Sequence, residues 1–241
     1  MRWLYFPDFK FQRRSHILYS VRQKMPININ LKNISRCNFL GKNTLTLGFV
    51  FLLSVFITFT PTLVYPKLLD MNLSFKVMVV LEFIVGFVTY LIFYMKSIGS
   101  IKNRIDILFI SLAVLLSIQF FSYILQKHDI GSIKITSDNA LSLFMLAIMI
   151  PFYEEVFYRG CLFDTLLSGF RGNLYLPAII TSVVFSLMHT QYSGVISFLI
   201  MFLISLILIN AKLKTNNIIT SIFLHSGMNS FFILINMQGF F

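Results

Sequence analysis

Charged residues are scarce in this chain: Asp, Glu, Lys and Arg together make up 12% of its 241 residues, against roughly 25% in an average soluble domain. Hydrophobic residues make up 57%, and the mean hydropathy is +0.80. This balance excludes an ordinary soluble domain and predicts an all-α membrane protein, because a transmembrane helix satisfies its own backbone hydrogen bonds. An open sheet facing lipid is excluded by the same argument, and the alternating pattern of a membrane barrel is absent.

Cysteine and acidic residues are also rare. The two cysteines, Cys37 and Cys161, are too few for a disulfide scaffold or a zinc ribbon, and we expect both to be free thiols. Nine acidic residues stand against twenty Lys and Arg, which gives a net charge of +11. Because these basic residues lie between apolar runs, we expect them to attract anionic lipid headgroups rather than nucleic acid.

Long apolar runs fill the rest of the chain, and each is near the ~20 residues that cross a bilayer. They predict a polytopic membrane helix bundle of about seven transmembrane helices. The predicted spans are Leu45–Tyr65, Val77–Met95, Ile105–Gln126, Ala140–Leu167, Leu174–Thr190, Ser193–Asn210 and Asn217–Met237. Three parts follow from this reading: a basic N-terminal arm at residues 1–44, three transmembrane helices at 45–139, and a core at 140–237.

The loop charges predict an orientation, because cytoplasmic loops carry an excess of Lys and Arg. If the N-terminus is cytoplasmic, fifteen Lys and Arg lie on that side and four on the other, with Arg159 inside a span. The arm supplies nine of the fifteen, and Lys212 and Lys214 are counted with the cytoplasmic loops. We therefore expect a multi-pass protein of the plasma membrane with a cytoplasmic N-terminus.

Ionisable side chains inside the predicted spans are few, and such residues are costly in lipid, so they are candidates for function. The chain has three glutamates, of which Glu154 and Glu155 are adjacent in the fourth span. Glu82 is placed near the end of the second span and is interpreted as a structural or snorkelling carboxylate. His189 and His225 lie in the fifth and seventh spans, and Asp164 lies nearer a helix end.

The spacing of these residues predicts specific neighbours. Glu155 and Arg159 are four apart, with the acid on the N-terminal side, which favours an ion pair within the helix. Glu154 is rotated by about 100° from Glu155, so it must face another element, where it could serve as a general base. His225 and Asn229 share one helix face. Taken alone, His189 and His225 could equally be structural histidines that bond across helices.

Depth along the helices is compatible with a common site. At 1.5 Å per residue, Glu154 and His189 lie about 22 and about 24 Å from the turn that joins their spans, and Asn229 lies about 18 Å from the start of its own. The three spans can therefore bring these groups to one layer of the membrane.

Three motifs carry a resemblance to a known family. Glu154-Glu155-x-x-x-Arg159, then Phe185-x-x-x-His189, then His225-x-x-x-Asn229 occur in this order on separate predicted helices, and Gly160 follows the arginine. This signature resembles the type II CAAX prenyl endopeptidase and bacteriocin-processing family, also called CPBP or Abi. The resemblance covers Ala140–Met237, and the first three spans match only as hydrophobic helices.

The resemblance implies intramembrane hydrolysis of a peptide bond. By similarity, Glu154 and His189 would activate a water, His225 and Asn229 would stabilise the oxyanion, and Glu155 and Arg159 would hold the motif helix. The family includes metalloproteases and metal-independent glutamate proteases. Glu154, His189 and His225 could bind zinc with an open water position, or act without metal. There is no His-Glu-x-x-His zincin motif and no Gly-x-Ser-x-Gly elbow in the sequence.

The resemblance further implies a peptide or protein substrate, either prenylated or bacteriocin-like. Two other readings stay open at this stage. A non-catalytic protein of bacteriocin self-immunity, or another partner-binding protein, would keep the motif and not need Glu154 for its function. A transporter would relay protons or ions through buried charges, and would need polar residues along the first three spans, where Glu82 is the one charged residue apart from Asp106 at the very start of the third span.

Overall fold

The computed structural model describes residues 43–64, 70–95, 104–126, 136–170, 173–190 and 194–237. The chain divides into two units, Met1–Phe39 and Leu40–Phe241, and all described residues belong to the second. The predicted N-terminal arm, apart from its last two residues, and Cys37 within it lie outside the described residues.

Helices make up the described part of the chain, and no strand occurs among these residues. Three of the described stretches are π-helical, with hydrogen bonds that reach back five residues. The elements are α3 (Thr44–Thr58), α4 (Thr60–Val64), α5 (Met71–Thr89), the π-helix η1 (Tyr90–Tyr94), α6 (Ile105–Gln126), α7 (Ser137–Phe144), the π-helix η4 (Met145–Met149), α8 (Ile150–Glu154), the π-helix η5 (Glu155–Leu162), α9 (Phe163–Gly169), α10 (Tyr175–Met188), α11 (Val195–Thr215) and α12 (Ile218–Ile235).

The predicted helical membrane bundle is confirmed. Within the described residues, five helices are long and apolar enough to cross a bilayer: Met71–Tyr94, Ile105–Ile124, Asn139–Gly169, Val195–Thr215 and Ile218–Ile235. Two shorter apolar helices, Thr44–Thr58 and Tyr175–Met188, occupy the other predicted spans. Two predicted boundaries are wrong, because the second helix begins at Met71 instead of Val77 and the sixth runs to Thr215 instead of Asn210.

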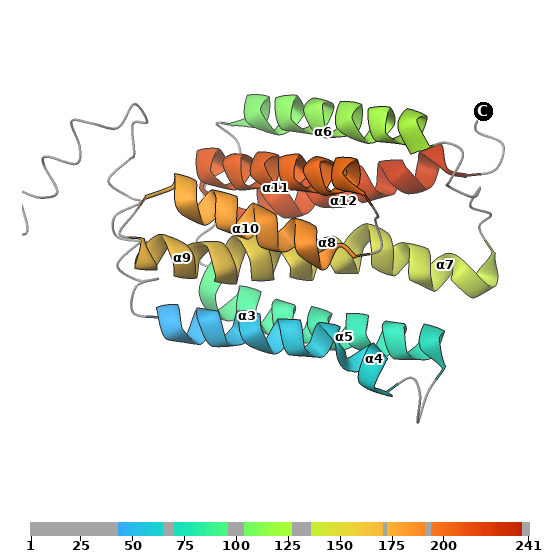
Figure 1. Cartoon of the computed structure of the whole chain (residues 1–241), viewed down its shortest axis with the longest axis horizontal. Coiled ribbons are helices and arrows are strands. Elements are labelled where there is room, and N and C mark those ends of the chain that lie inside the picture. Colours follow the sequence, from blue (N-terminus) through green and yellow to red (C-terminus); the bar gives the residue numbers. More distant parts are fainter. Residues whose placement is uncertain are drawn as a thin grey trace, which may run out of the picture. The chain divides into compact units, whose positions relative to one another are not determined.

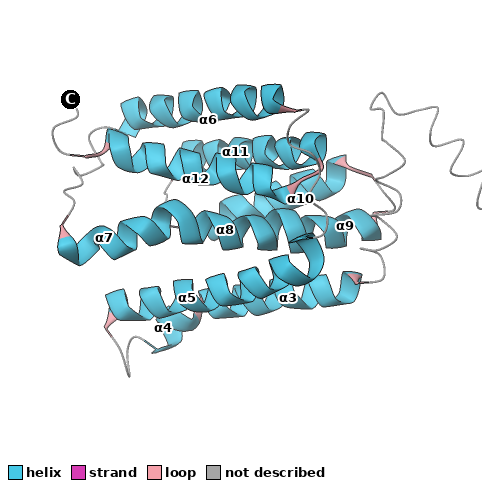
Figure 2. Ribbon diagram, turned by 180° about the vertical axis from the view of Figure 1, so that it is seen from behind, coloured by secondary structure: helices cyan, strands magenta, loops and turns pink. Residues whose placement is uncertain are grey.

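The helices of the second unit lie side by side in layers (Figure 1). Elements α7, η4, α8, η5 and α9 form one continuous rod, Ser137–Gly169, which we call the central rod. Helices α3 and α5 pack on one side of it, and α10 and α12 pack on the other. Helix α11 packs on α10 and α12, and α6 covers α11 and α12, as the reverse view in Figure 2 also shows.

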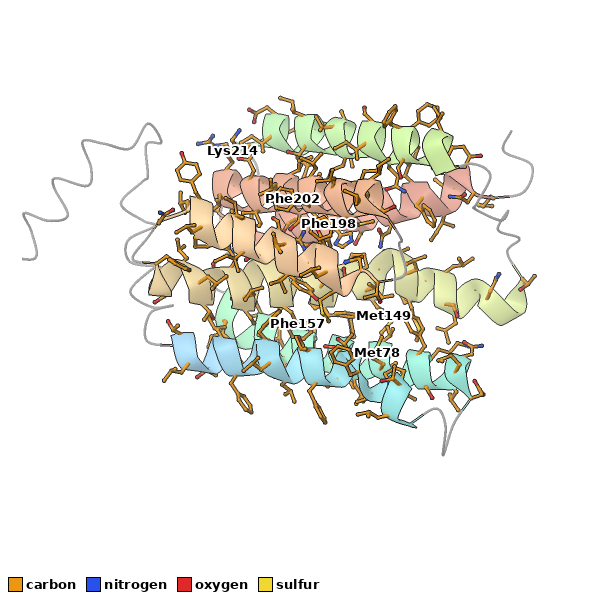
Figure 3. The ribbon with its side chains drawn as sticks, viewed as in Figure 1. Met78, Met149, Phe157, Phe198, Phe202 and Lys214 are labelled. Atoms are coloured by element: carbon orange, nitrogen blue, oxygen red, sulfur yellow. The ribbon has the colours of Figure 1, made fainter. Side chains whose placement is uncertain are left out.

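Glycines let α5 and η1 approach the central rod closely. A Cβ atom added to Gly86 would lie 2.9 Å from the Tyr153 Cβ atom, and one added to Gly160 would lie 3.0 Å from the Tyr94 ring. Buried apolar side chains fill the remaining space of this interface, and Figure 3 shows Met78, Met149 and Phe157 between the two layers. Two elements that precede the motifs in the sequence, α5 and η1, thus pack closely against the central rod.

A second apolar cluster joins α6, α11 and α12. It contains Leu115, Ile204, Leu208, Ala211, Leu224 and Met228. Many large apolar side chains point outward, such as Leu45, Phe49 and Phe109, which are 90%, 67% and 64% exposed. An apolar outer surface of this extent is stable only in lipid.

Candidate active site

The central rod changes its helical pitch where the first motif lies. Glu154 is the last residue of α8, and Glu155 begins the π-helix η5, which ends at Leu162. The wider turn of a π-helix is frequent at functional sites, because it leaves backbone groups and side chains in positions that a regular α-helix does not offer. Residues 155–161 are all buried.

Glu155 and Arg159 form the predicted ion pair inside the bundle. The Nη1 atom of Arg159 lies 3.1 Å from Oε1 of Glu155, and both side chains are fully buried. His225 on α12 donates from Nδ1 to the same Oε1 atom over 2.8 Å. Glu155 therefore links α12 to the rod through His225. Its own negative charge, which would be costly alone in lipid, is compensated by Arg159 in the same helix.

Phe185 on α10 is the centre of the aromatic packing around these charges. Its ring lies 4.1 Å under the Arg159 guanidinium, an arrangement that attracts the cation to the ring face. The same ring lies 4.2 Å from the His189 ring and 6.1 Å from the His225 ring, measured between centroids. The phenylalanine of the second motif thus fixes groups of all three motifs against one another.

Glu154 faces the two histidines, as its rotation from Glu155 required. Its Oε2 atom lies 3.9 Å from Nε2 of His189 and 3.9 Å from Nε2 of His225. The Oε2 atom is buried and makes no hydrogen bond to any residue that the structure describes. A gap of 3.9 Å is too long for a direct hydrogen bond but accommodates one bridging atom with a bond to each side.

The other ring nitrogen of each histidine has an oxygen acceptor. Nδ1 of His189 lies 2.7 Å from the Phe185 carbonyl oxygen, which can only accept, so Nδ1 carries a hydrogen. In the neutral ring, Nε2 of His189 then carries the lone pair, and it lies 3.9 Å from the Glu154 Oε2 atom. His225 is oriented in the same way by the Glu155 carboxylate.

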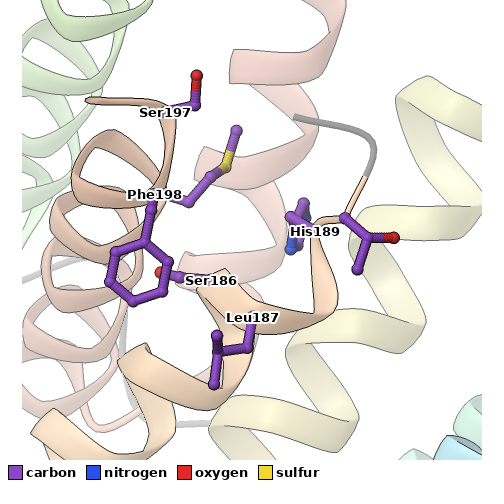
Figure 4. A pocket seen from close by; sticks show the side chains of 7 residues that line it. Ser186, Leu187, His189, Ser197 and Phe198 are labelled. Atoms are coloured by element: carbon purple, nitrogen blue, oxygen red, sulfur yellow. The ribbon is translucent and has the colours of Figure 1, made fainter. Parts of the chain in front are cut away.

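Two side chains of this cluster are partly exposed. The side chains of Glu154 and His189 are 16% and 12% exposed, whereas Glu155 and Arg159 are fully buried. A pocket of about 160 Å³ lies beside His189, and Figure 4 shows Ser186, Leu187 and Phe198 around it; its lining is completed by Thr190, Ser197 and Met201.

Helix α10 has fourteen residues, or about 21 Å at 1.5 Å per residue, so it ends at His189 short of a ~30 Å core.

Asn229, the last predicted site residue, lies on the same face of α12 as His225. Its amide nitrogen donates to the Leu146 carbonyl oxygen over 2.9 Å, in the π-helix η4 of the central rod. The structure thus places Asn229 against the rod, on the N-terminal side of Glu154. A second amide hydrogen is left on the same nitrogen.

Sequence reasoning missed a second buried polar cluster at the end of the rod. Lys212 is 4% exposed and donates to Asp164 Oδ1 over 2.6 Å and to the Arg159 carbonyl oxygen. The Tyr94 hydroxyl donates to the other Asp164 oxygen. The prediction that Lys212 lies beyond the end of the sixth span is therefore wrong, because α11 continues to Thr215. The cytoplasmic position of this end of α11 stays a prediction. The sequence offered one signal for this cluster, because Lys212 and Asp164 each lie near an end of an apolar run.

The predicted position of Glu82 near the end of its span is also wrong. The helix begins at Met71, so Glu82 lies near its middle instead of near its end, and the side chain is 1% exposed. It accepts a hydrogen bond from the Thr58 hydroxyl over 2.9 Å. Snorkelling to the interface is excluded, and the structural interpretation of this carboxylate is the one that fits.

The residue types around Glu154 fit a zinc site in kind, but their spacing is wide. Ligands around a tetrahedral zinc ion are separated by about 3.4 Å, whereas Glu154 lies 3.9 Å from each histidine. No group of three His, Cys, Asp or Glu at metal-binding spacing occurs among the described residues. The oxygen acceptors on both Nδ1 atoms are nevertheless what metal-binding histidines have.

Residues 136–231 match the family of type II CAAX prenyl endopeptidase Rce1-like proteins. An uncharacterised 24.3 kDa protein of Escherichia coli is 29% identical over 92 residues, which are 38% of this chain and 42% of that relative. No solved structure matches significantly. The family predicted from the three motifs is confirmed for this segment, and with five long apolar helices the chain is a multi-pass integral membrane protein.

Proposed function

We propose that this Rce1-like chain is an intramembrane endopeptidase in which Glu154 and His189 activate the water that hydrolyses a peptide bond. The observation that carries the proposal is the position of the Glu154 Oε2 atom, which is buried, lacks a hydrogen bond to the described residues, and faces two imidazole nitrogens at 3.9 Å. This gap holds one water, hydrogen-bonded to Glu154 and to His189, on the exposed side of the cluster.

In the first step, the Glu154 carboxylate takes a proton from this water, and the water oxygen forms a bond to the scissile carbonyl carbon. His189 accepts the second hydrogen bond of the water through Nε2, and the Phe185 carbonyl keeps the ring in this orientation. The carbonyl oxygen becomes an oxyanion, which is stabilised by the Asn229 amide and by the imidazolium form of His225, which carries a hydrogen on both ring nitrogens. The tetrahedral intermediate then breaks its C–N bond, and Glu154 returns the proton to the leaving amine.

Glu155 and Arg159 have no contact with the reacting atoms in this scheme. Glu155 holds His225 by Nδ1, and Arg159 compensates the charge of Glu155. If a zinc ion is bound when the enzyme is active, Glu154, His189 and His225 would hold it, and it would polarise the carbonyl and the water. No step described above depends on it.

The substrate is a peptide or protein within or at the membrane, prenylated or bacteriocin-like. The pocket beside His189 has about 160 Å³, close to the ~150 Å³ that accommodates a benzene ring in an engineered cavity. This pocket therefore takes a single side chain next to the scissile bond. A fifteen-carbon farnesyl group would have to lie elsewhere, against the lipid-facing helices. The N-terminus is proposed to lie in the cytoplasm and the protein in the plasma membrane, from the loop charges.

The first test compares the N-termini of membrane proteins in cells that produce the parent chain with those in cells that produce Glu154→Gln. New termini are expected only with the parent. Identical sets of termini would contradict the proposed role of Glu154, and would favour the immunity or partner-binding reading.

Peptides built around the new termini, with and without a prenyl group, then serve as substrates for the purified protein. Glu154→Gln and His189→Ala are expected to lower kcat by about 10²- to 10⁴-fold, the usual contribution of a general base. Glu82→Gln is the matched control, because the same change on a buried carboxylate keeps an acceptor for the Thr58 hydroxyl. Metal content and chelator sensitivity of the parent decide whether zinc takes part.

A further inference from the structure

The central rod leaves one backbone carbonyl without its usual partner immediately before Glu154. In the π-helix η4, hydrogen bonds reach back five residues, and the last of them joins the Ile150 amide to the Met145 carbonyl. The next amide in this register belongs to residue 151 and would donate to the carbonyl of Leu146. Residue 151 is proline, which has no N–H.

An unpartnered carbonyl in this position is unfavourable. Pro151 is buried, and inside a membrane bundle there is little water to replace a missing amide. Freed carbonyls at prolines in transmembrane helices are therefore paired by side chains of neighbouring helices or by ordered water. The Leu146 carbonyl needs such a donor.

Asn229 is that donor in this structure. Its amide nitrogen lies 2.9 Å from the Leu146 carbonyl oxygen, and α12 packs against η4, α8 and η5. One turn earlier on the same face of α12, His225 donates to Glu155. Helix α12 thus binds the rod on both sides of Pro151 and Glu154.

We propose that Asn229 supplies to the Leu146 carbonyl the hydrogen bond that Pro151 cannot make, and thereby fixes the register of the segment that carries Glu154. Asn229 is then a positioning residue, in addition to any contact that its second amide hydrogen makes with an oxyanion. The catalytic consequence rests on the proposed function, whereas the hydrogen bond itself does not.

A double-mutant cycle tests the inference, because Pro151→Ala restores an N–H that can reach Leu146. Unfolding of the protein in detergent is measured for the parent, Asn229→Ala, Pro151→Ala and the double variant. Asn229→Ala is expected to shift the folding equilibrium about fivefold towards the unfolded state in the parent, and less than twofold in the Pro151→Ala background. An equal shift in both backgrounds would overturn the inference.

Asn236→Ala is the matched control. The Asn236 amide also donates to a carbonyl oxygen, that of Phe232 in its own helix, over 2.8 Å. Its removal is expected to cost the same in both backgrounds, since Pro151 takes no part in this bond.

A direct readout remains available if one of these variants unfolds too easily. Labelling with carbonyl-¹³C leucine and ¹⁵N alanine selects Leu–Ala pairs, which occur only at residues 112–113 and 146–147. Asn229→Asp, at a pH where the carboxylate is ionised and cannot donate, is expected to shift the Leu146 carbonyl signal upfield and to leave that of Leu112 in place. An unchanged Leu146 signal would refute the hydrogen bond.

Cleavage rates separate positioning from a structural role. The loss of kcat on Asn229→Ala is expected to be at least tenfold smaller in the Pro151→Ala background than in the parent. A loss of equal size in both backgrounds, with the stability cycle as expected, would show that Asn229 acts only on the oxyanion. If the protein cleaves nothing, the stability and labelling results still decide the inference.

Discussion

Gly86 offers a way to move Glu154 without touching the motifs. It lies on α5, opposite Tyr153, the residue before Glu154. In Gly86→Ala the new Cβ atom would meet the Tyr153 Cβ atom at 2.9 Å and its backbone Cα atom at 3.2 Å. Carbon atoms in contact are normally about 3.5–4.0 Å apart, so α5 and the central rod must separate by roughly 0.6 Å or more.

Two consequences of this displacement can be estimated. Overpacking of a tight interface costs about 1–3 kcal/mol, from which about 0.8–1.0 kcal/mol is recovered because alanine favours a helix over glycine. The net loss of stability is therefore at most about 2 kcal/mol, and the variant should fold. Catalysis is more sensitive, since misplacement of a reacting group by about 1 Å can cost 10²-fold. We expect kcat to fall by about 10- to 100-fold.

Gly48→Ala is the matched control, since Gly48 is also within a helix that packs on the rod. Its added Cβ atom would lie 3.6 Å from the Thr165 Cγ2 atom, an ordinary contact. This variant is expected to keep its activity and to gain up to about 1 kcal/mol of stability. Thermal unfolding and single-turnover cleavage of both variants provide the comparison. If Gly86→Ala behaves like Gly48→Ala in both assays, the claim that α5 sets the position of Glu154 is wrong.

Four further substitutions test the buried charges and the aromatic ring that packs on them. Lys212→Met and Asp164→Asn should each destabilise the protein by about 3–5 kcal/mol, because each leaves an unpaired buried charge. The double variant should lose less stability than the two single variants together, and chemical unfolding of all three measures these losses. Arg159→Lys should lower stability despite its retained charge, because an ammonium loses the stacking of the guanidinium on Phe185, and a variant as stable as the parent would contradict it. Phe185→Leu should lower kcat more than it raises KM, because the ring packs on His189 but has no place in the reaction scheme; steady-state kinetics would show the opposite split if Phe185 bound substrate.

The sequence was enough to predict the helices and the meeting of the three motifs. Long apolar runs predict the spans, because in lipid the backbone of such a run satisfies its hydrogen bonds by forming a helix. The ion pair between Glu155 and Arg159 follows from their spacing of four residues. The rotation of Glu154 away from Glu155 required a partner on another helix, and two histidines provide it. A family signature and simple helical geometry thus carried the prediction of which side chains gather; their catalytic roles remain a proposal.

Other features depend on how helices pack, which a single sequence does not reveal. The π-helical turn at Glu155–Leu162 and the one before Pro151 have no reliable pattern in composition. Lys212 was predicted to lie in a loop because the last turn of an apolar helix and the loop after it have the same composition. Its contact with Asp164 shows that it belongs to the helix. Glu82 was misplaced by a boundary error of six residues, from Val77 to Met71, which is large enough to move a side chain from the interface to the interior.

The pairing of Glu155 with Arg159 also bears on how the protein is made. Each charge alone would oppose entry into the bilayer by roughly 2.5–3.5 kcal/mol, but the two lie on one helix and can neutralise each other before any neighbour has been synthesised. Lys212 and Asp164 lie on separate helices, so neither is compensated until α11 has emerged from the ribosome and joined the rod. The segment around Glu155 and Arg159 can therefore enter the bilayer with its charges already paired, whereas the end of the same rod at Asp164 gains its partner only when α11 is in place.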